Sequence, residues 1–452
     1  MAIALLKSNS VSPARRAAFE ILQRVEEGAY STILLASRED DLKPVDRALC
    51  HELVMGVLRR QLWLDRLIEF YANRKVSGLD AAVLVILRLG LYQLRFLSRV
   101  PPSAAVNESV KLVHYARLTS AAGLVNAILR RATREPEVDP TRDLDDPIER
   151  VTVATSHPAW LIERWTKVQG AEAAEAFAKA NNEPAPVAFR VVGARAQETE
   201  VCERLRQSGA ELVPSRVVSH AWRIVGGGRL LAELAAEGHL YLQDEASQLV
   251  AEVLDVLPGQ RVLDLCAAPG SKTTQIADQS LNSTASPLIV ASDLHGHRLK
   301  TVVSLAKLHG LRNIQCLAVD GLQPLPFAER SFDRVLVDAP CSGTGTLRRN
   351  PEIRWRISTA DILDLSRRQK QLLFNAAQVV KPGGRLIYST CSVEPDENED
   401  VVQTFLENNE AFKLGQLALD SSFLTSSGAA RTWPQREGTD GFFICAFERK
   451  GK

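Results

Sequence analysis

The sequence has little that could cross-link the chain or anchor it in a membrane. Its seven cysteines are an odd number, and they form neither a CxxC pair nor a Cys/His cluster at zinc-ligand spacing. Both a disulfide framework and a structural metal are therefore disfavoured. The most apolar helical stretch, from Ala81 to Leu97, is interrupted by Arg88 and Arg95, and the N-terminal run MAIALLKSNS is too short for a signal peptide. We expect a cytoplasmic protein that holds no metal and spans no membrane.

A large net charge is also missing, but the charges are unevenly distributed. The whole chain carries a formal charge of +1, whereas residues 1–134 hold 20 Lys and Arg against 12 Asp and Glu, and the rest holds 35 against 42. A basic part joined to an acidic part suggests a polyanionic partner, and nucleic acid is the leading candidate. A solvated basic surface without a partner is the alternative.

Helical and strand-like patterns divide the chain into four segments. Residues 1–134 show apolar positions at helical spacing and predict an all-helical bundle. Residues 135–150 are rich in Pro and Asp and predict a linker. Residues 151–235 predict a small α/β domain, and residues 236–452 alternate short apolar strands with helices, which predicts a doubly wound parallel sheet. The expected strands are Val187–Val192 and Val217–Val225 in the small domain, then Arg261–Leu265, Leu288–Asp293, Ile314–Asp320, Arg334–Asp338 and Arg385–Ser389.

A loop in the last segment has the setting of a cofactor site. The sequence has no GxGxxG fingerprint and no Walker loop, which disfavours NAD and ATP. Instead, the stretch DLCAAPGSKTT follows a strand and opens a helix, an arrangement that can receive a nucleotide-bearing cofactor. Its backbone amides can approach a ligand because the side chains are small. The loop consists of Cys266, Ala267, Ala268, Pro269, Gly270, Ser271 and Lys272.

Two acidic residues at the following strand ends narrow the choice of cofactor. Asp293 ends the second strand, where a carboxylate can bind ribose hydroxyls, and Asp320 ends the third, where it can accept from an adenine amino group. Either residue alone could instead cap a helix. Together they predict an adenosine cofactor without a phosphate requirement, namely S-adenosylmethionine.

Two cysteines lie 50 positions apart, each directly after an apolar run. Cys341 lies in VDAPCSGTGTLRRNPEIRW, and Cys391 lies in IYSTCSVEPDENE. Both thiols are expected at the carboxyl ends of strands, where a parallel sheet displays its reactive groups. The alternative for either one alone is a small buried hydrophobic residue. The neighbouring cofactor loop makes a reactive pair the better interpretation.

Three segments resemble a known family. DLCAAPGSKT, DAPCSGTGTLRRNPEIRW and YSTCSVEPDENE are similar to the cofactor loop, the Pro-Cys motif and the Thr-Cys motif of the RNA 5-methylcytosine methyltransferases of the Sun/NOL/NOP family. Ser271 stands where many relatives have a second Gly. The N-terminal part resembles the NusB-like RNA-binding domain in VPPSAAVNESVKL and GLVNAILRRA. The resemblance implies a multidomain chain: a NusB-like bundle, an RRM-like extension at 151–235, and a Rossmann-like catalytic domain that uses S-adenosylmethionine.

The resemblance also implies roles for individual residues. Cys391 is the nucleophile, and Cys341 assists product release, as the base or by positioning one. Asp338, three residues before Cys341, is placed to hydrogen-bond the cytosine ring and to line the cofactor site, and its alternative role is to cap the end of a strand. Carbon-5 of cytosine is a poor nucleophile, and adding a thiolate to carbon-6 activates it. The residues alone do not assign the two thiols, because DNA cytosine methyltransferases use the Pro-Cys thiol as nucleophile. Lys272 contacts the base or the cofactor, or is a solvated cation.

The implied substrate is RNA with an unpaired target base. NusB-like fusions in the family are similar to bacterial enzymes that modify a cytosine of 16S ribosomal RNA, and the base must leave its stack, which favours a single-stranded loop. We expect a monomer. A transfer RNA substrate and a catalytically idle RNA-binding module remain open alternatives. Four arginines beside the Pro-Cys motif are candidates to hold RNA phosphates: Arg348, Arg349, Arg354 and Arg356.

Overall fold

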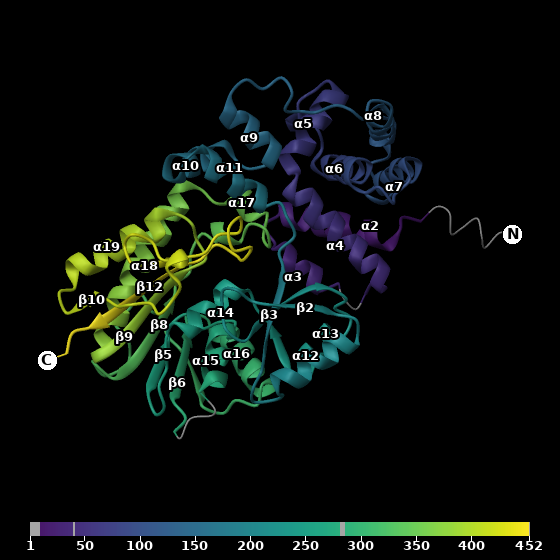
Figure 1. The fold of residues 1–452 in the computed structure, drawn as a ribbon. Helices are drawn as coiled ribbons and strands as arrows, with labels where there is room; N and C mark the ends of the chain where they lie inside the picture. Colours follow the sequence, from purple (N-terminus) through teal and green to yellow (C-terminus); the bar gives the residue numbers. More distant parts are fainter. Residues whose placement is uncertain (1–9, 39–40, 281–284, 452) are drawn as a thin grey trace. The chain divides into compact units, whose positions relative to one another are not determined.

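The computed structural model describes residues 10–38, 41–280 and 285–451 (Figure 1). Its backbone divides into two compact units. The first comprises Met1–Pro184 and the short segment Leu347–Arg356. The second comprises Ala185–Thr346 and Ile357–Lys452. The chain therefore leaves the second unit just after the Pro-Cys motif and returns to it ten residues later.

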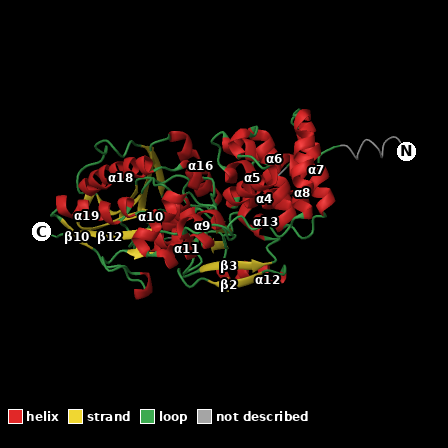
Figure 2. Cartoon of the chain, turned by 90° about the horizontal axis from the view of Figure 1, so that it is seen from above, coloured by secondary structure: helices red, strands yellow, loops and turns green. Residues whose placement is uncertain are grey.

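The first unit is built from helices, drawn in red in Figure 2. Its central helix buries residues on nearly all sides, and Arg88 within it donates to Asp65 and Glu26, both at 2.7 Å. The predicted helical bundle is therefore confirmed. The helices are α2 (Pro13–Glu26), α3 (Ser31–Ala36), α4 (Pro44–Arg59), α5 (Gln61–Ala72), α6 (Ala81–Phe96, the central helix), α7 (Pro102–Tyr115), α8 (Ala122–Arg134), α9 (Pro147–Thr155), α10 (Ala159–Gln169), α11 (Ala171–Ala180) and α17 (Ile353–Arg356), with short 3-10 turns η1 (Val76–Gly78) and η2 (Thr119–Ala121).

Residues 135–150 are irregular for most of their length. The next helix, α9, begins at Pro147, which lies inside the segment 135–150 that the sequence predicts to be a linker. Asp146 caps it by accepting a hydrogen bond from the amide of Ile148 at 3.0 Å, and Pro147 occupies its first turn. The helices α9 to α11 group with the first unit and lie outside the small sheet that follows.

The second unit begins with a small antiparallel sheet. Its element order is strand, helix, strand, strand, helix, strand, and its strands lie in the order β2-β3-β1-β4, which is the ferredoxin-like arrangement. The predicted strand at Val217–Val225 begins later, because Ser215 accepts hydrogen bonds from the amides of Val217 and Val218 and holds them in a turn. The elements are β1 (Val187–Val191), α12 (Glu198–Gln207), β2 (Glu211–Pro214), β3 (Ala221–Gly226), α13 (Leu231–Ala236) and β4 (Leu240–Leu242).

The remainder of the second unit is a large mixed sheet in the order β10-β12-β9-β8-β5-β6-β7. The strands from β9 to β7 are parallel, as predicted, but β12 runs antiparallel to β9 and carries β10 and β11 as further antiparallel partners. The elements are α14 (Glu245–Glu252), β5 (Arg261–Asp264), α15 (Ser271–Gln279), β6 (Leu288–Asp293), α16 (Gly296–Leu308), β7 (Ile314–Ala318), β8 (Phe332–Asp338), η3 (Thr344–Thr346), α18 (Thr359–Val379), β9 (Val380–Thr390), η4 (Pro395–Glu397), α19 (Glu399–Asn408), β10 (Phe412–Leu414), η5 (Ser421–Phe423), β11 (Ala430–Arg431) and β12 (Phe443–Arg449).

Helices cover both faces of this sheet (Figure 1). Val262 and Ile289 face the core beneath α14, α15 and α16, whereas Leu263 and Val290, their neighbours in sequence, face the core beneath α18 and α19. Strands buried on both faces read as continuous apolar runs, which is why the sequence located them. No helix in the described part of the chain is both long and apolar enough to cross a membrane.

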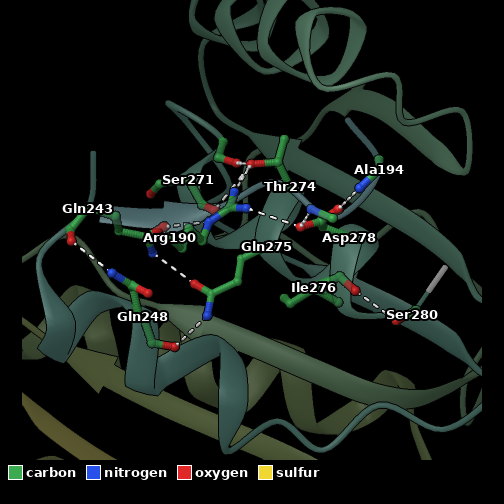
Figure 3. A network of polar contacts seen from close by, with 12 residues as sticks. Arg190, Ala194, Gln243, Gln248, Ser271, Thr274, Gln275, Ile276, Asp278 and Ser280 are labelled. Atoms are coloured by element: carbon green, nitrogen blue, oxygen red, sulfur yellow. Dashed lines mark hydrogen bonds and ion pairs between the residues drawn. The ribbon is translucent and has the colours of Figure 1, made fainter. Parts of the chain in front are cut away.

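A buried arginine joins the small sheet to α15 (Figure 3). Arg190, on β1, donates to Gln243 at 3.1 Å, to the hydroxyl of Thr274 at 3.1 Å and to Asp278 at 3.5 Å, and it lies over the ring of Tyr241. Burial lowers its pKa to about 10, while Asp278 and Tyr241 act in the opposite direction. The ferredoxin-like sheet is thereby fixed to the helix that follows the candidate cofactor loop.

Candidate active site

The predicted site residues gather at one edge of the large sheet. Adjacent parallel strands end on the same side, and this is where ligands bind in sheets of this kind. The loop Cys266–Lys272 follows β5 and leads into α15. At this edge Asp293 ends β6, Asp338 ends β8, Cys341 follows β8, Cys391 follows β9, and Asp320 comes two residues after the end of β7.

The two candidate thiols are direct neighbours. The sulfur atoms of Cys341 and Cys391 lie 3.2 Å apart, and both residues are partly exposed, unlike the buried thiols of Cys50 and Cys202. The hydrogen bond with Cys391 and burial together raise the pKa of Cys341 well above its usual range. Either thiol can donate in the hydrogen bond between the two sulfurs. The two thiols are therefore neighbours in space, and Cys391 also packs against the hydrophobic core.

Lys272 and Asp338 form an ion pair beside the thiols. Lys272 Nζ lies 2.7 Å from Asp338 Oδ2, and the hydroxyl of Ser389 donates to Asp338 Oδ1 at 2.7 Å. Lys272 is buried in α15, so its alternative as a solvated cation is wrong. Burial alone would lower the pKa of Lys272, but the charge and hydrogen bond of Asp338, with a smaller contribution from Cys391, raise it overall. A fixed positive charge thus acts on Cys391.

A carboxylate that the sequence did not single out links the loops carrying the thiols. Glu397, in η4, is completely buried. Its Oε1 accepts from the amide of Ser342 and from Gln369, both at 2.9 Å. Its Oε2 accepts from the hydroxyls of Ser342 and Ser392, both at 2.5 Å. Burial raises the pKa of Glu397, and these hydrogen bonds oppose that rise. Each serine directly follows one of the two cysteines.

Backbone contacts fix the same two loops. The amide of Gly345 donates to the carbonyl of Cys391 at 2.9 Å, and the amide of Gly441 donates to the carbonyl of Gly345 at 2.8 Å. A Cβ atom on Gly345 would lie 1.9 Å from the Gly441 carbonyl oxygen, so this approach requires glycine. The hydroxyl of Thr344 also accepts from the amide of Val393 at 3.1 Å. The thiol separation therefore rests on several independent contacts.

The cofactor half of the edge contains a buried carboxylate oxygen without a partner among the described residues. Gly270 precedes α15 with φ +107°, a left-handed conformation suited to glycine, and its carbonyl accepts from Thr274 at 2.8 Å. Asp264, at the end of β5, accepts from Thr273 at 2.6 Å through Oδ2, whereas its buried Oδ1 has no hydrogen-bond partner among the described residues. Burial raises the pKa of Asp264 to about 7.

The two predicted cofactor carboxylates hold turns within the protein. Asp293 accepts from the amide of His295 at 3.0 Å and pairs with Arg298 at 3.2 Å, and Arg298 also donates to the Ala268 carbonyl at 3.1 Å. Asp320 accepts from the amide of Leu322 at 3.0 Å. With the small-residue loop and the unpartnered oxygen of Asp264, these acceptors fit a ligand that brings hydroxyl and amino donors.

The arginines beside the Pro-Cys motif do not behave as one RNA-binding group. Arg354 is completely buried within the first unit, where it donates to the carbonyl of Ser156 at 3.1 Å and to Asn182 at 2.9 Å. Arg356 donates to the carbonyls of Gly28 at 3.1 Å and Ala29 at 2.7 Å. The prediction that Arg354 holds a phosphate is wrong, because a guanidinium surrounded by protein acceptors cannot reach RNA.

Two of the site residues missed by the sequence analysis had weak signals. Glu397 belongs to the acidic run PDENED, which normally indicates a solvated surface. The sequence does show that each motif cysteine is followed by a serine, and in the structure the hydroxyls of these two serines donate to the same carboxylate oxygen. Asp264 is the first residue of the segment DLCAAPGSKTT, but the sequence pattern assigns it no role. Burial distinguishes both residues from the surface acids, and only the fold reveals it.

Comparison with known proteins agrees with this architecture. Residues 251–448 match the family of 16S rRNA methyltransferase RsmB/F, residues 12–134 match the NusB family, and residues 157–230 match the ferredoxin-like domain of the RsmF/B type. The probable ribosomal RNA small subunit methyltransferase B of Bacillus subtilis (strain 168) is 33% identical over 458 residues, covering 99% of this chain and 100% of the relative. Its counterpart in Synechocystis sp. is 35% identical over 449 residues, covering 96% and 99%.

Solved structures give the same result for the fold. PH0851 aligns with a TM-score of 0.83 at 29% identity, over 97% of this chain and 99% of that one. NSun6 from Pyrococcus horikoshii, solved with SFG, aligns with a TM-score of 0.58 at 20% identity, over 65% of this chain and 99% of that one. The NusB-like bundle, the ferredoxin-like domain and the Rossmann-like domain are thus confirmed, and the chain belongs to the family of 16S rRNA methyltransferases RsmB/F.

Proposed function

We propose that this rRNA methyltransferase transfers a methyl group from S-adenosylmethionine to carbon-5 of a cytosine in 16S ribosomal RNA, through a covalent bond between Cys391 and the base. The observation that carries the proposal is the pair of sulfur atoms 3.2 Å apart at the ends of adjacent strands β8 and β9. Carbon-5 chemistry on cytosine needs one thiol to attack and a second group to release the product. A pair of neighbouring thiols at the sheet edge matches that requirement.

The surroundings of the two sulfurs support Cys391 as the nucleophile. Lys272, which interacts electrostatically with Cys391, would stabilise negative charge that develops on that sulfur during attack, and Cys341 lies within hydrogen-bond distance of it. The Cys391 sulfur bonds to carbon-6, and the electron pair moves to carbon-5. After methylation a base removes the carbon-5 proton, the double bond re-forms, and the sulfur–carbon bond breaks. Cys341 assists this last step, as the base or by positioning one.

The residues around the loop Cys266–Lys272 would hold the cofactor. S-adenosylmethionine supplies an electrophilic methyl group when it is bound. Asp293 would accept from its ribose hydroxyls and Asp320 from its adenine amino group, while the loop amides face it. Asp338, held by Lys272 and Ser389, borders both this site and the thiols. NSun6 from Pyrococcus horikoshii, which has a similar fold, was solved with SFG.

The two flanking domains would bind the RNA. On α8, Arg130 and Arg134 are exposed and line a groove of about 580 Å³ together with Asn126 and Thr133, a setting suited to phosphate contacts. The proposed domain boundaries remain 1–134, 135–150, 151–235 and 236–452. We further propose that the protein is a cytoplasmic monomer. Its target cytosine would lie in a single-stranded loop, because the base must leave its stack to enter the pocket.

A covalent trapping experiment tests the roles of the thiols. Cys341→Ala should still form the bond to cytosine and accept the methyl group, but stall before elimination. A protein–RNA adduct that survives denaturing electrophoresis should therefore accumulate with Cys341→Ala and disappear with Cys341→Ala/Cys391→Ala. Cys316→Ala, which changes an exposed thiol on β7, is the matched control and should give no adduct. An adduct that appears with Cys391→Ala and depends on Cys341 would reverse the assignment.

The substrate is tested separately by mapping. Bisulfite sequencing of total RNA from cells with and without the gene should reveal one 16S cytosine whose protection depends on the gene. Loss of protection in a transfer RNA instead would move the substrate to the transfer RNA alternative. If no cytosine in total RNA changes its protection when the gene is removed, the idle RNA-binding module would be favoured.

A further inference from the structure

We propose that Glu397 is a positioning residue that sets the separation of the two thiols by binding the serine after each of them. The proposal rests on the proposed function, because it assigns that separation a purpose. The positioning proposal goes beyond the proposed function because it names a residue that would touch neither the substrate nor the cofactor. The side chain of Glu397 is completely buried, and its hydrogen bonds to Ser342 and Ser392 are the observations behind the proposal.

The geometry makes this carboxylate the shared contact of two distant segments. Ser342 and Ser392 are 50 positions apart, as are Cys341 and Cys391, and the serine hydroxyls lie 3.0 Å apart while the sulfurs lie 3.2 Å apart. Oε2 of Glu397 accepts from both hydroxyls at once. Each thiol is therefore one residue away from a group that is fixed to the same oxygen atom.

The chemistry of the four donors explains why a carboxylate is needed. The contacts to Glu397 come from one backbone amide, one side-chain amide and two hydroxyls, all of which donate. A carboxylate offers only acceptors and can serve all four. A glutamine of the same size would turn an NH2 group toward part of this donor set. Glu397→Gln therefore changes the hydrogen bonding while leaving the volume of the side chain intact.

Further contacts from η4 and its neighbours keep Glu397 itself in place. Its backbone carbonyl accepts from the hydroxyl of Tyr388 at 2.6 Å. The adjacent Asn398 donates to the carbonyl of Ser392 at 2.9 Å and accepts from Thr390 at 2.6 Å. Gln369, on α18, donates to both Glu397 and the carbonyl of Pro340, at 2.9 Å each. The carboxylate is thus anchored to β9 and α18, and the loops take their position from it.

The proposal predicts a specific kinetic pattern. In Glu397→Gln the sulfurs spend less time at reactive separation, so kcat should fall by about 10²-fold, the loss expected when reacting groups move by about 1 Å. The KM for RNA and the affinity for S-adenosylmethionine should stay within about twofold, because Glu397 contacts neither. Asp400→Asn, an exposed acid in the same run, is the matched control and should leave all three quantities unchanged.

A second measurement reports thiol separation without any methyl transfer. Diamide oxidises two adjacent thiols to a disulfide and is itself reduced to the hydrazine, so its reaction rate with the full-length protein measures how often the sulfurs meet. Peptide mapping should show a Cys341–Cys391 bond forming about tenfold more slowly in Glu397→Gln and in Ser342→Ala/Ser392→Ala than in the wild type, with Asp400→Asn unchanged.

The two measurements separate the failure of this proposal from that of the proposed function. If diamide joins Cys341 to Cys391 at the same rate in the wild type, Glu397→Gln and the double serine variant, Glu397 does not set the separation and the proposal is overturned. If the rates differ as expected while the wild type methylates no cytosine, the positioning role stands and the proposed function fails.

Discussion

The two halves of the strand-end edge are built in opposite ways. Around the thiols, the buried carboxylate of Glu397 receives four donors, although Oε1 of Gln369, whose amide group is one of them, has no hydrogen-bond partner among the described residues. Around the cofactor loop, Asp264 keeps a buried oxygen without a partner among the described residues. The difference indicates that the thiol half is organised before substrate arrives, whereas the cofactor half keeps hydrogen-bonding capacity for a ligand.

This contrast predicts that changes on the two sides affect different measurements. Substitutions in the thiol half should act on the chemical step with little effect on cofactor affinity. Substitutions in the cofactor half should act on affinity or on the protonation of the site. Three variants, taken from the largest expected effect to the smallest, test that separation.

The largest effect is expected from Cys391→Ala. Without the nucleophile the ring cannot be activated, so transfer of a labelled methyl group to RNA should fall below detection. The dissociation constant for S-adenosylmethionine, measured by calorimetry, should stay within about twofold, because the thiol contacts the base. Cys316→Ala, at an exposed position on β7, should retain full activity and controls for general thiol loss. Substantial turnover in Cys391→Ala would remove the nucleophile assignment and with it the contrast.

The thiol half also shows where reasoning from sequence succeeds and where it stops. The strand Leu288–Asp293 was predicted with its observed bounds, and the placement of Cys341 and Cys391 at strand ends was correct, because buried parallel strands are continuous apolar runs bounded by polar loops. The strand β12 was not among the predicted strands, and its antiparallel direction could not have been predicted either, since an apolar run carries no information on its direction. Glu397 was missed because an acidic run looks solvated until the fold buries it.

The functional assignments divide along the same line. The motifs were sufficient to place the loop Cys266–Lys272 and Asp338 at one edge, since parallel strands of one sheet end on the same side whatever their order across the sheet. The burial of Arg354 was not predictable, because its sequence context is a basic cluster typical of RNA contacts. Its partners Ser156 and Asn182 lie in the turns after α9 and α11, 198 and 172 positions earlier in the chain. Long-range contacts of this kind leave no local pattern.

A smaller effect is expected from Asp293→Ala in the cofactor half. Removing a carboxylate that accepts from the ligand leaves its donors unpaired, which costs about 1–3 kcal/mol, or roughly 5- to 150-fold in the dissociation constant. Calorimetry with S-adenosylmethionine measures the loss. At saturating cofactor the rate of methyl transfer should recover most of its wild-type value. Asp400→Ala, an exposed acid outside this edge, should leave the affinity unchanged, and unchanged affinity in Asp293→Ala itself would contradict the role of Asp293.

The smallest effect on methyl transfer is expected from Asp264→Asn, which should instead change how the stability of the protein depends on pH. Burial raises the pKa of Asp264 to about 7, above the value near 3.8 of the unfolded chain, so the folded protein binds this proton more tightly. As pH rises from about 4 to 7, the unfolded chain releases this proton while the folded protein keeps it, so the stability of the folded state falls, and the full loss is present above pH 7. The difference between the two pKa values corresponds to a change of at most about 4 kcal/mol in the free energy of unfolding.

Asparagine at position 264 does not ionise, so it removes that slope. The thermal midpoint of Asp264→Asn, relative to the wild type, should rise between pH 5 and pH 8, measured by calorimetry without cofactor. A constant offset from the altered contact with Thr273 is expected at every pH, and only the slope carries the test. Asp400→Asn should show no slope relative to the wild type. A flat difference for Asp264→Asn would mean that Asp264 is ionised at low cost, and hence that its unpaired oxygen does not distinguish the cofactor half from the thiol half.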